Sequence, residues 1–284
     1  MKVAISGASG FVGSNLIRYF ARKGYKLVSL NRSFFKENVP IGKLKDTLTD
    51  VDVVINLAGA PINYPWTNSY RKEMYNSRIL VTRKLVGAIN SLDRKPNVFI
   101  SASAVGYYPI EGCYDEYSSQ RGDGFLAELC EEWEEEAKKV SSDVRLAITR
   151  FGVILAKTGG AFELMSLPAK FKVATVIGPG NQPFPWIYLN DLMKATDYII
   201  NQSSINGIVN FVAPQHITNH QLMKAIAKRE RSLLTITVPR LFFRLVLGEA
   251  STFMTTGQCV VPKKLLESGF NFDVPAIDNF LDTL

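Results

Sequence analysis

The chain has 284 residues, of which 46% are hydrophobic and 21% charged, and its net charge at pH 7 is +7. This composition excludes a disordered chain and allows a sizeable core, so it fits one large α/β unit or a nucleotide domain with a small lobe. The basic residues are scattered along the chain rather than gathered in one stripe, which disfavours a nucleic-acid partner.

Targeting and metal signals are sparse. No apolar run approaches the ~18 residues of a membrane span, and a strand pattern starts at once, so we expect no signal peptide and no membrane partner. Cys113, Cys130 and Cys259 are far apart and odd in number, without metal or redox spacing. They fit a reducing cytoplasm best. His216 and His220 lack a third ligand, and we interpret them as surface histidines rather than a metal site.

The first 32 residues predict a βαβ unit. Residues 2–6 are an apolar run of strand type, residues 14–23 alternate with helical period, and residues 26–30 form a second apolar strand. Glycines stand between the first strand and the helix. Their spacing, G-x-x-G-x-x-G, resembles that of the short-chain dehydrogenase/reductase superfamily, in its extended and atypical branches.

Each glycine of this turn has a physical reason. Gly7 permits the tight turn, Gly10 lets the backbone approach a pyrophosphate, and Gly13 lets the helix lie close on the strand. The free N–H groups at the start of the helix then face the phosphates. The expected dinucleotide-binding residues of the turn are Gly7, Ser9, Gly10, Phe11, Val12 and Gly13. The alternative is a glycine-rich turn that binds nothing.

The end of the second strand indicates which dinucleotide is bound. Enzymes that use NAD usually place a carboxylate there, on the ribose 2′-hydroxyl, whereas this chain has Asn31 and Arg32. An arginine can bind the 2′-phosphate of NADP through its planar guanidinium. The sequence therefore predicts NADP(H) as the cofactor, and the alternative is that Arg32 is a solvated surface arginine.

Strands and helices alternate through the rest of the chain. Strands are expected over residues 51–57, 97–102, 144–155, 186–189, 207–213 and 233–238, and helices over residues 69–91, 124–141, 219–228 and 239–247. Residues 162–176 are expected to form one or two helices broken by Pro168, and Asp191 is expected to cap a helix that ends at Ile200.

This order predicts an α/β fold, namely a Rossmann-type doubly wound parallel sheet with a small C-terminal α/β substrate lobe. We expect a nucleotide-binding domain over residues 1–155. Residues 156–284 are expected to form a mixed region, in which segments near residues 186–213 return to the Rossmann sheet.

Polar side chains at a strand end supply the catalytic candidates. Ser101 and Ser103 end an expected strand, at the edge where open parallel sheets bind ligands. The stretch SASAVGYYP resembles the S-S-x-x-V-Y-G stretch of extended family members, in which Ser103 matches the catalytic serine. A serine that satisfies local backbone is the alternative. Tyr107, Tyr108 and Glu116 are candidates for the proton donor, and each could equally be packing or pocket wall.

The expected helix over residues 124–141 departs from the superfamily. Its Tyr-x-x-x-Lys pair, in which the lysine lowers the pKa of the tyrosine, is missing. Phe125 or Leu126 stands at the tyrosine position, and Leu129 or Cys130 at the lysine position.

The same helix carries a run of glutamates. We expect them to form a solvated face with pairs four residues apart, such as Glu134 with Lys138.

Eight segments together resemble one subgroup, the atypical NAD-dependent epimerase/dehydratase-like proteins related to the bacterial YfcH protein. They are GASGFVG, NLAGAPI, NSRI, SASAVGYYP, CEEWEEEA, RFGVILAKTGG, GPGNQPFPWI and VPKKLLESGFNF. The resemblance implies NADP(H) contacts at Asn31, Arg32, Leu57, Ala58, Glu73, Arg78 and Leu155. The small residues of the segment NLAG, which ends at Gly59, let the backbone pass close to the nicotinamide-side ribose. Ser101 is also expected to be a cofactor-binding residue.

Two functions are compatible with these patterns. The first is an NADP(H)-dependent oxidoreductase, or a protein similar to nucleotide-sugar epimerases, that acts on an unknown small carbonyl or hydroxyl substrate. The second is a catalytically impaired module that binds NADP(H) and reports its redox state to a partner. A homodimer is possible in either case.

Overall fold

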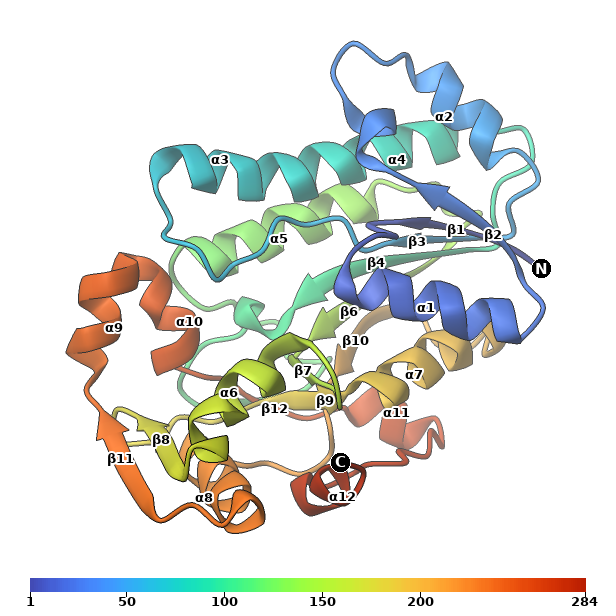
Figure 1. Ribbon diagram of the computed structural model, residues 1–284. Helices are drawn as coiled ribbons and strands as arrows, with labels where there is room; N and C mark the ends of the chain where they lie inside the picture. The colour runs from blue at the N-terminus through green and yellow to red at the C-terminus, as the bar shows by residue number, and fades with distance from the viewer.

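The computed structural model describes residues 1–284 and has a six-stranded parallel sheet at its centre (Figure 1). Its strand order is β10-β6-β4-β3-β1-β2. The strands are β1 (Lys2–Ser6), β2 (Lys26–Leu30), β3 (Val53–Asn56), β4 (Val98–Ala104), β6 (Arg145–Phe151) and β10 (Gly207–Phe211). From β1 the chain forms β2 on one side and then crosses to β3 on the other, so the sheet is doubly wound, with its switch point at β1. The predicted Rossmann-type sheet is confirmed.

Helices cover both faces of this sheet (Figure 1). One face carries α2 (Ile41–Leu48), α4 (Val81–Asn90) and α5 (Phe125–Lys138); the other carries α1 (Phe11–Arg22), α7 (Leu189–Asn201) and α11 (Lys263–Glu267). Most residues of the central strands are apolar because helices bury both faces of the sheet. All strands run parallel, so their carboxyl ends meet at one edge, where the candidate site lies.

The expected helix over residues 69–91 is present but is not uniform. It consists of α3 (Asn68–Tyr75), a π-helical turn over Asn76–Leu80, and α4. Such turns are rare and often occur at functional sites. Here the turn carries Arg78, one of the expected cofactor residues.

Two expected elements between residues 144 and 176 are divided differently. The expected strand over residues 144–155 is split at Gly152 into β6 and β7 (Val153–Leu155). The expected helices over residues 162–176 are wrong in their second half, because α6 (Gly160–Lys170) is followed by strand β8 (Val173–Ile177). Pro168 lies in the last turn of α6, where a proline shortens a helix without breaking its middle.

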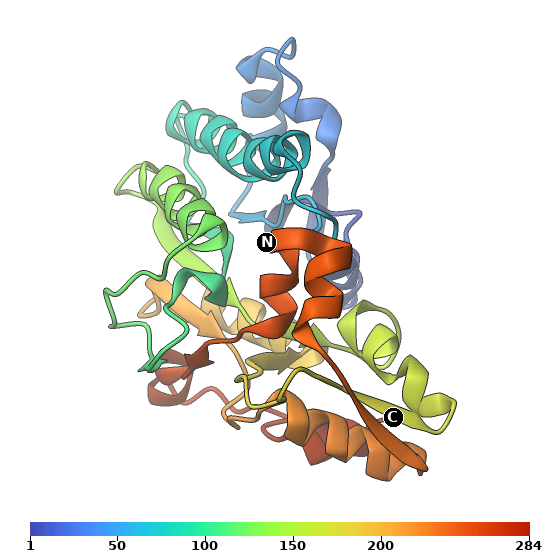
Figure 2. The ribbon, with the colours of Figure 1, turned by 90° about the vertical axis from the view of Figure 1, so that its left-hand side faces the viewer.

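Three short parallel strand pairs, each with at least one strand from the C-terminal part of the chain, and five helices lie beside the sheet (Figure 2). The pairs are β7 with β9 (Trp186–Tyr188), β8 with β11 (Leu234–Val238), and β5 (Cys113–Tyr114) with β12 (Cys259–Val260). The helices are α6, α8 (Asn219–Glu230), α9 (Arg240–Leu247), α10 (Thr252–Thr255) and α12 (Ile277–Asp282). None of the helices is both long enough and apolar enough to cross a lipid bilayer.

Asp191 does not cap a helix, so this prediction from the sequence is wrong. It lies in the first turn of α7, whose N-cap is Tyr188. Its buried carboxylate accepts hydrogen bonds from the backbone N–H groups of Asp273 and Val274, at 2.8 and 2.9 Å. Burial raises the pKa of Asp191. The carboxylate therefore ties the C-terminal segment to α7.

The cysteine spacing was also misleading. Cys113 and Cys259 are separated by 146 residues in the sequence and form a disulfide. They are brought together because β5 and β12 pair with these two residues in register. The separation of two cysteines in the sequence does not show whether their strands pair. Because two of the three cysteines form a disulfide, the cysteines no longer support the expectation of a reducing compartment.

Candidate functional site

The glycine-rich turn has the tight geometry that the sequence predicts. Gly7 has a φ of 70°, and a Cβ built on it would lie 2.6 Å from the carbonyl oxygen of Leu57. A Cβ on Gly13 would lie 2.2 Å from the carbonyl oxygen of Gly7. A Cβ on Gly10 would meet only that same oxygen, at 3.2 Å. Gly7 and Gly13 are thus required by the fold, whereas Gly10 mainly keeps its outer face open.

The start of α1 is left open to a ligand. Gly10 is its N-cap and supplies no side-chain hydrogen bond, so the first N–H groups of the helix have no partner in the chain. Ser9, Gly10 and Phe11 are exposed, and Val12 is half-buried. Free N–H groups at the positive end of a helix form an anion site. The turn can therefore hold a pyrophosphate.

Asn31 and Arg32 lie directly beyond β2, at the same edge of the sheet. The side chain of Asn31 accepts a hydrogen bond from the backbone N–H of Ser33 at 3.0 Å and so shapes the turn. Arg32 is exposed and makes no ion pair or side-chain hydrogen bond. Its guanidinium is free to bind a phosphate, and no carboxylate occupies this position.

A second segment of the expected cofactor site follows β3. The guanidinium of Arg78 donates to the carbonyl oxygens of Ala60 and Met74, at 2.9 and 3.2 Å. A Cβ on Gly59 would lie 3.0 Å from the Cζ atom of Arg78, so the glycine allows this close contact. Burial lowers the pKa of Arg78. The structure thus brings Arg78 against the backbone that continues from Leu57 and Ala58.

The remaining expected cofactor residues lie on separate segments. Leu155 is fully buried at the end of β7, and the following Gly159 and Gly160 pack on the ring of Phe11. That contact places the segment after β7 beside the glycine-rich turn. Glu73 is exposed on α3 and has no ion-pair partner.

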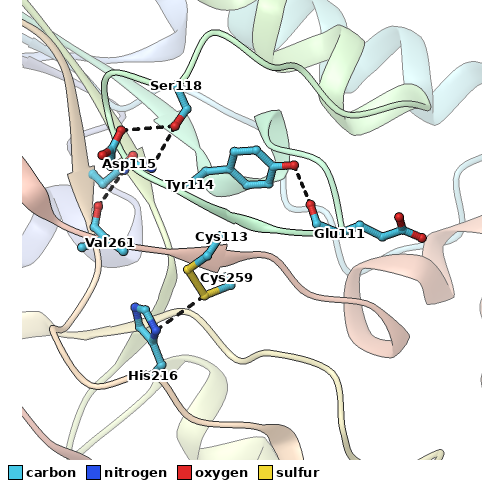
Figure 3. Close-up of a disulfide and its surroundings, with 9 residues drawn as sticks. Glu111, Cys113, Tyr114, Asp115, Ser118, His216, Cys259 and Val261 are labelled. Atoms are coloured by element: carbon cyan, nitrogen blue, oxygen red, sulfur yellow. Dashed lines mark hydrogen bonds between the residues drawn. A yellow bond between two sulfur atoms is a disulfide. The ribbon is translucent and has the colours of Figure 1, made fainter.

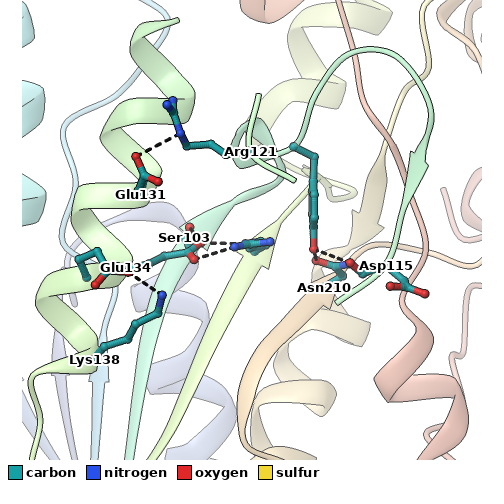
Figure 4. Close-up of polar contacts among 10 residues, drawn as sticks. Ser103, Asp115, Arg121, Glu131, Glu134, Lys138 and Asn210 are labelled. Carbon is teal, nitrogen blue, oxygen red and sulfur yellow. Dashed lines mark hydrogen bonds and ion pairs between the residues drawn. The ribbon is translucent and has the colours of Figure 1, made fainter. Parts of the chain in front are cut away.

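A row of polar residues crosses three neighbouring strands near their carboxyl ends. Ser103 on β4 is in register with Arg150 on β6, which is in register with Asn210 on β10. From α5, Glu134 reaches this row (Figure 4). It accepts a hydrogen bond from the Ser103 hydroxyl at 2.6 Å, and it binds Arg150 through both oxygens, at 2.8 and 2.7 Å.

This ion pair is almost completely buried. The side chains of Arg150 and Glu134 are 3% and 2% exposed. Burial alone would lower the pKa of Arg150, but the hydrogen bonds and negative charge of Glu134 outweigh it and raise that pKa. One guanidinium nitrogen, Nη1, has no hydrogen-bond partner. The ring of Tyr107 stacks on the guanidinium, 3.5 Å from Cζ to the ring centroid, which is a cation–π contact.

The expectation that the glutamates of α5 form a solvated face was wrong for Glu134 and for Glu136, which are both buried. Glu136 pairs with Arg83 at 2.7 Å. Lys138 pairs with Glu135 rather than with Glu134, at 2.7 Å. Glu134 follows the free thiol Cys130 by four residues, and both lie on the buried side of the helix. Two signals could have revealed the pair: Glu134 has helical spacing from Cys130, and Arg150 lies in the middle of an expected buried strand. A buried charge needs a partner.

The other candidate proton donors have different surroundings. The Tyr107 side chain is half-buried, and its hydroxyl makes no hydrogen bond. The Tyr108 hydroxyl is buried against Asn210 and the carbonyl of Asp115, at 3.0 and 3.1 Å, and burial raises its pKa. Glu116 accepts hydrogen bonds from the backbone N–H groups of Asn210 and Lys264, and burial raises its pKa too. Tyr108 and Glu116 therefore hold segments together, whereas Tyr107 remains available.

The position where the superfamily has its Tyr-x-x-x-Lys lysine is filled by an inert group. Cys130 is buried, and burial raises the pKa of its thiol to about 11. Ser101, two residues before Ser103 on the same face of β4, has a buried hydroxyl without a partner. This part of the site supplies hydroxyl groups and a buried cation, but no lysine that could return a proton to a tyrosine.

Comparison with known proteins agrees with this geometry. A family model described as the NAD dependent epimerase/dehydratase family matches residues 3–211, and a domain of unknown function, DUF1731, matches residues 238–284. An epimerase family protein of Staphylococcus saprophyticus is 34% identical over 99% of this chain and 98% of its own length. The chloroplastic SDR39U1 homolog of Arabidopsis thaliana is 33% identical over 96% of this chain and 83% of its own length.

Solved structures show the same fold. The human epimerase family protein SDR39U1, solved with NADPH, is 27% identical, with a TM-score of 0.89 over 100% of this chain and 98% of that one. UDP-glucuronic acid 4-epimerase from Bacillus cereus, at 18% identity and a TM-score of 0.79 over 99% of this chain and 97% of that one, supports the fold alone. With an open glycine-rich turn at the switch point of a parallel sheet and a family model that covers most of its length, the chain belongs to the NAD-dependent epimerase/dehydratase family.

Proposed function

We propose that the protein binds NADP(H) and reduces a small carbonyl compound. The observation that carries the cofactor assignment is Arg32, which is exposed, unpaired and placed directly beyond β2 where a carboxylate would select NAD. The human relative solved with NADPH supports the same choice. The narrower resemblance, to the YfcH-related subgroup, remains a prediction.

Different residues of the chain would bind different parts of the cofactor. The N–H groups at the start of α1 would hold the pyrophosphate, and Arg32 the 2′-phosphate. The backbone at Leu57, Ala58 and Gly59 would lie against the nicotinamide-side ribose. When bound, NADPH supplies a hydride to the carbonyl carbon.

Tyr107 is the proton donor in this proposal. Its hydroxyl has no partner in the chain, so it is free to hydrogen-bond a carbonyl oxygen of the substrate and to donate its proton to it. The stacked cation of Arg150 would favour negative charge that develops on the phenol oxygen. No lysine stands at the position that activates the tyrosine as a base in the superfamily, which favours carbonyl reduction over alcohol oxidation.

Ser103 has a narrower role than its position suggests. Its hydroxyl proton is committed to Glu134, so the oxygen can accept a hydrogen bond but has no proton to donate to a carbonyl. We assign Ser103 to positioning the substrate through a hydroxyl group that the substrate itself carries.

The experiment measures NADPH consumption with a panel of aldehydes and ketones. Turnover with one class of carbonyl is expected, and Tyr107→Phe should lower kcat about 100-fold without changing the affinity for NADPH. Tyr117→Phe is the matched control, because that tyrosine is 61% exposed and contacts Glu267. Equal turnover in wild type and Tyr107→Phe would contradict the assignment of the donor.

A module that reports the redox state of NADP(H) is the second candidate. Two observations favour it. Leu126 and Cys130 stand at the positions of the Tyr-x-x-x-Lys pair of the superfamily, and Ser103 is almost completely buried, at 2% exposed. Tight binding of NADPH without turnover on any carbonyl, together with a partner that binds differently in the presence of NADP⁺ and NADPH, would select this function over the enzyme.

A further inference from the structure

The disulfide lies outside the proposed cofactor site and has an unusual neighbour. The Sγ atom of Cys259 is 3.5 Å from Nδ1 of His216, and the two cysteines join β5 to β12 (Figure 3). Cys113 and His216 are exposed, and Cys259 is half-buried. One cysteine of the disulfide is therefore an exposed residue, while the sulfur of the other is in contact with an imidazole.

Two properties decide how fast a disulfide exchanges with a thiol. The attacked sulfur must be accessible, and the departing sulfur must be stabilised as a thiolate. Exposure meets the first condition at Cys113. The imidazole of His216 meets the second at Cys259, because an N–H group can donate to the departing sulfur.

We propose that Cys113–Cys259 is a thiol–disulfide exchange site, which accepts an external thiol at Cys113 and releases Cys259 as a thiolate held by His216. An external thiolate forms a bond to Sγ of Cys113. The bond between Cys113 and Cys259 breaks, and its electron pair stays on Sγ of Cys259, which takes a hydrogen bond or a proton from Nδ1 of His216. A second external thiolate then attacks the external sulfur and releases Cys113 as a thiolate and the external disulfide as product.

Other contacts would keep the two strands together after the bond is broken. The N–H of Val261 donates to the carbonyl of Tyr114 at 2.8 Å (Figure 3). Lys263 pairs with Asp115 at 3.1 Å. Both contacts adjoin the disulfide and are independent of it. The reduced cysteines therefore remain in register, and the exchange is reversible.

The chain offers a matched pair of variants for the test, because it has only two histidines. The full-length protein is treated at one pH with glutathione in one arm and with thioredoxin in the other, and the reduced fraction is followed by alkylation and mass spectrometry. His216→Ala should slow reduction by glutathione about threefold or more, because the departing thiolate of Cys259 loses its hydrogen bond to the imidazole. His220→Ala should leave the rate unchanged. Equal rates in wild type and His216→Ala would overturn the proposal.

The site of attack is read on the wild-type protein, so this result does not depend on the folding of a variant. Peptide mapping after an acid quench should find glutathione on Cys113, and glutathione on Cys259 would overturn the proposal. Cys130 serves as an internal standard, because its buried thiol, with a pKa raised to about 11, should stay unalkylated. A protein that shows no Cys113–Cys259 disulfide after oxidation, or one that exchanges with neither thiol, would also overturn it. No dinucleotide is present, so failure here leaves the proposed NADP(H) function untouched.

Discussion

The glycine-rich turn and the cluster of Ser103, Glu134 and Arg150 lie at the same edge of the sheet but are built in opposite ways. The turn works through backbone: its glycines hold the tight shape, and the N–H groups of Phe11, Val12 and Gly13 at the start of α1 have no partner in the chain. The cluster works through side chains that are nearly all buried and paired. The first region is open to a ligand, and the second is already satisfied from within.

This difference separates binding from chemistry. A site made of free backbone groups binds an anion with little change in the chain, because nothing has to be displaced. In the cluster, the buried ion pair fixes Tyr107 and Ser103 in place, and the Tyr107 hydroxyl and Arg150 Nη1 are left without partners, as is the neighbouring Ser101 hydroxyl. Substitutions in the two regions should therefore have different effects. Those in the turn should weaken cofactor binding, and those in the cluster should lower the stability of the fold.

The largest effect is expected in the cluster. Glu134→Gln removes the charge that Arg150 needs in a buried site, and it should lower the free energy of unfolding by about 3–5 kcal/mol. Glu135→Gln, one residue along the same helix, breaks an exposed pair with Lys138 and should cost less than about 0.5 kcal/mol. Denaturant unfolding measures both. A similar small loss in the two variants would show that the buried pair does not organise this region.

The next effect belongs to the turn. Gly10→Ala adds a Cβ at an ordinary φ of −73°, with only the carbonyl oxygen of Gly7 near it, so the fold should survive. The new methyl group would stand where the pyrophosphate approaches, and NADPH affinity should fall about 100-fold, or about 2.7 kcal/mol. Gly42→Ala is the control, because a Cβ there would meet nothing within 4 Å. Titration by fluorescence or calorimetry decides the outcome, and unchanged affinity for Gly10→Ala would remove the turn from the cofactor site.

A charge reversal beyond β2 should separate the two cofactors. Arg32→Asp is expected to weaken NADPH binding about 10- to 100-fold and to leave NADH binding nearly unchanged, because only NADPH carries the 2′-phosphate. Lys26→Asp, an exposed site at the other end of the same strand, controls for the general change in charge. Equal losses for NADPH and NADH would discard the assignment of Arg32.

The smallest effect is at the opposite edge of the sheet, away from both regions. Asp52 accepts hydrogen bonds from the backbone N–H of Lys2 at 2.7 Å and from Arg94 at 2.8 Å, and these lower its pKa. Because the pKa of Asp52 is lower in the folded than in the unfolded state, its carboxylate stabilises the fold when the pH is above its unfolded pKa. This stability is lost as the pH falls through the folded pKa. Asp52→Asn should cost less than about 1 kcal/mol at pH 7, since the pair is partly exposed, and nothing once the carboxyl is protonated. Urea unfolding at pH 7 and in the acid range measures the difference, and a constant loss across pH would contradict this reason.

The sequence predicted the first region more fully than the second for a physical reason. The turn depends on residues close in sequence, and each glycine has a local geometric cause that a pattern can reveal. The cluster joins β4, β6 and α5, and nothing in the spacing of Ser103, Glu134 and Arg150 shows that they meet. The same holds for Cys113 and Cys259, which pair only because β5 and β12 pair. The sheet itself was predictable because its strands are short apolar runs separated by helices.

The central claim is that the open turn at β1, together with Arg32, binds NADP(H), and calorimetric titration of the wild-type protein with NADPH tests it most directly. We predict a saturable binding heat with NADPH that is much weaker with NADH. The absence of any heat with NADPH at millimolar concentration, on folded protein, would contradict the account.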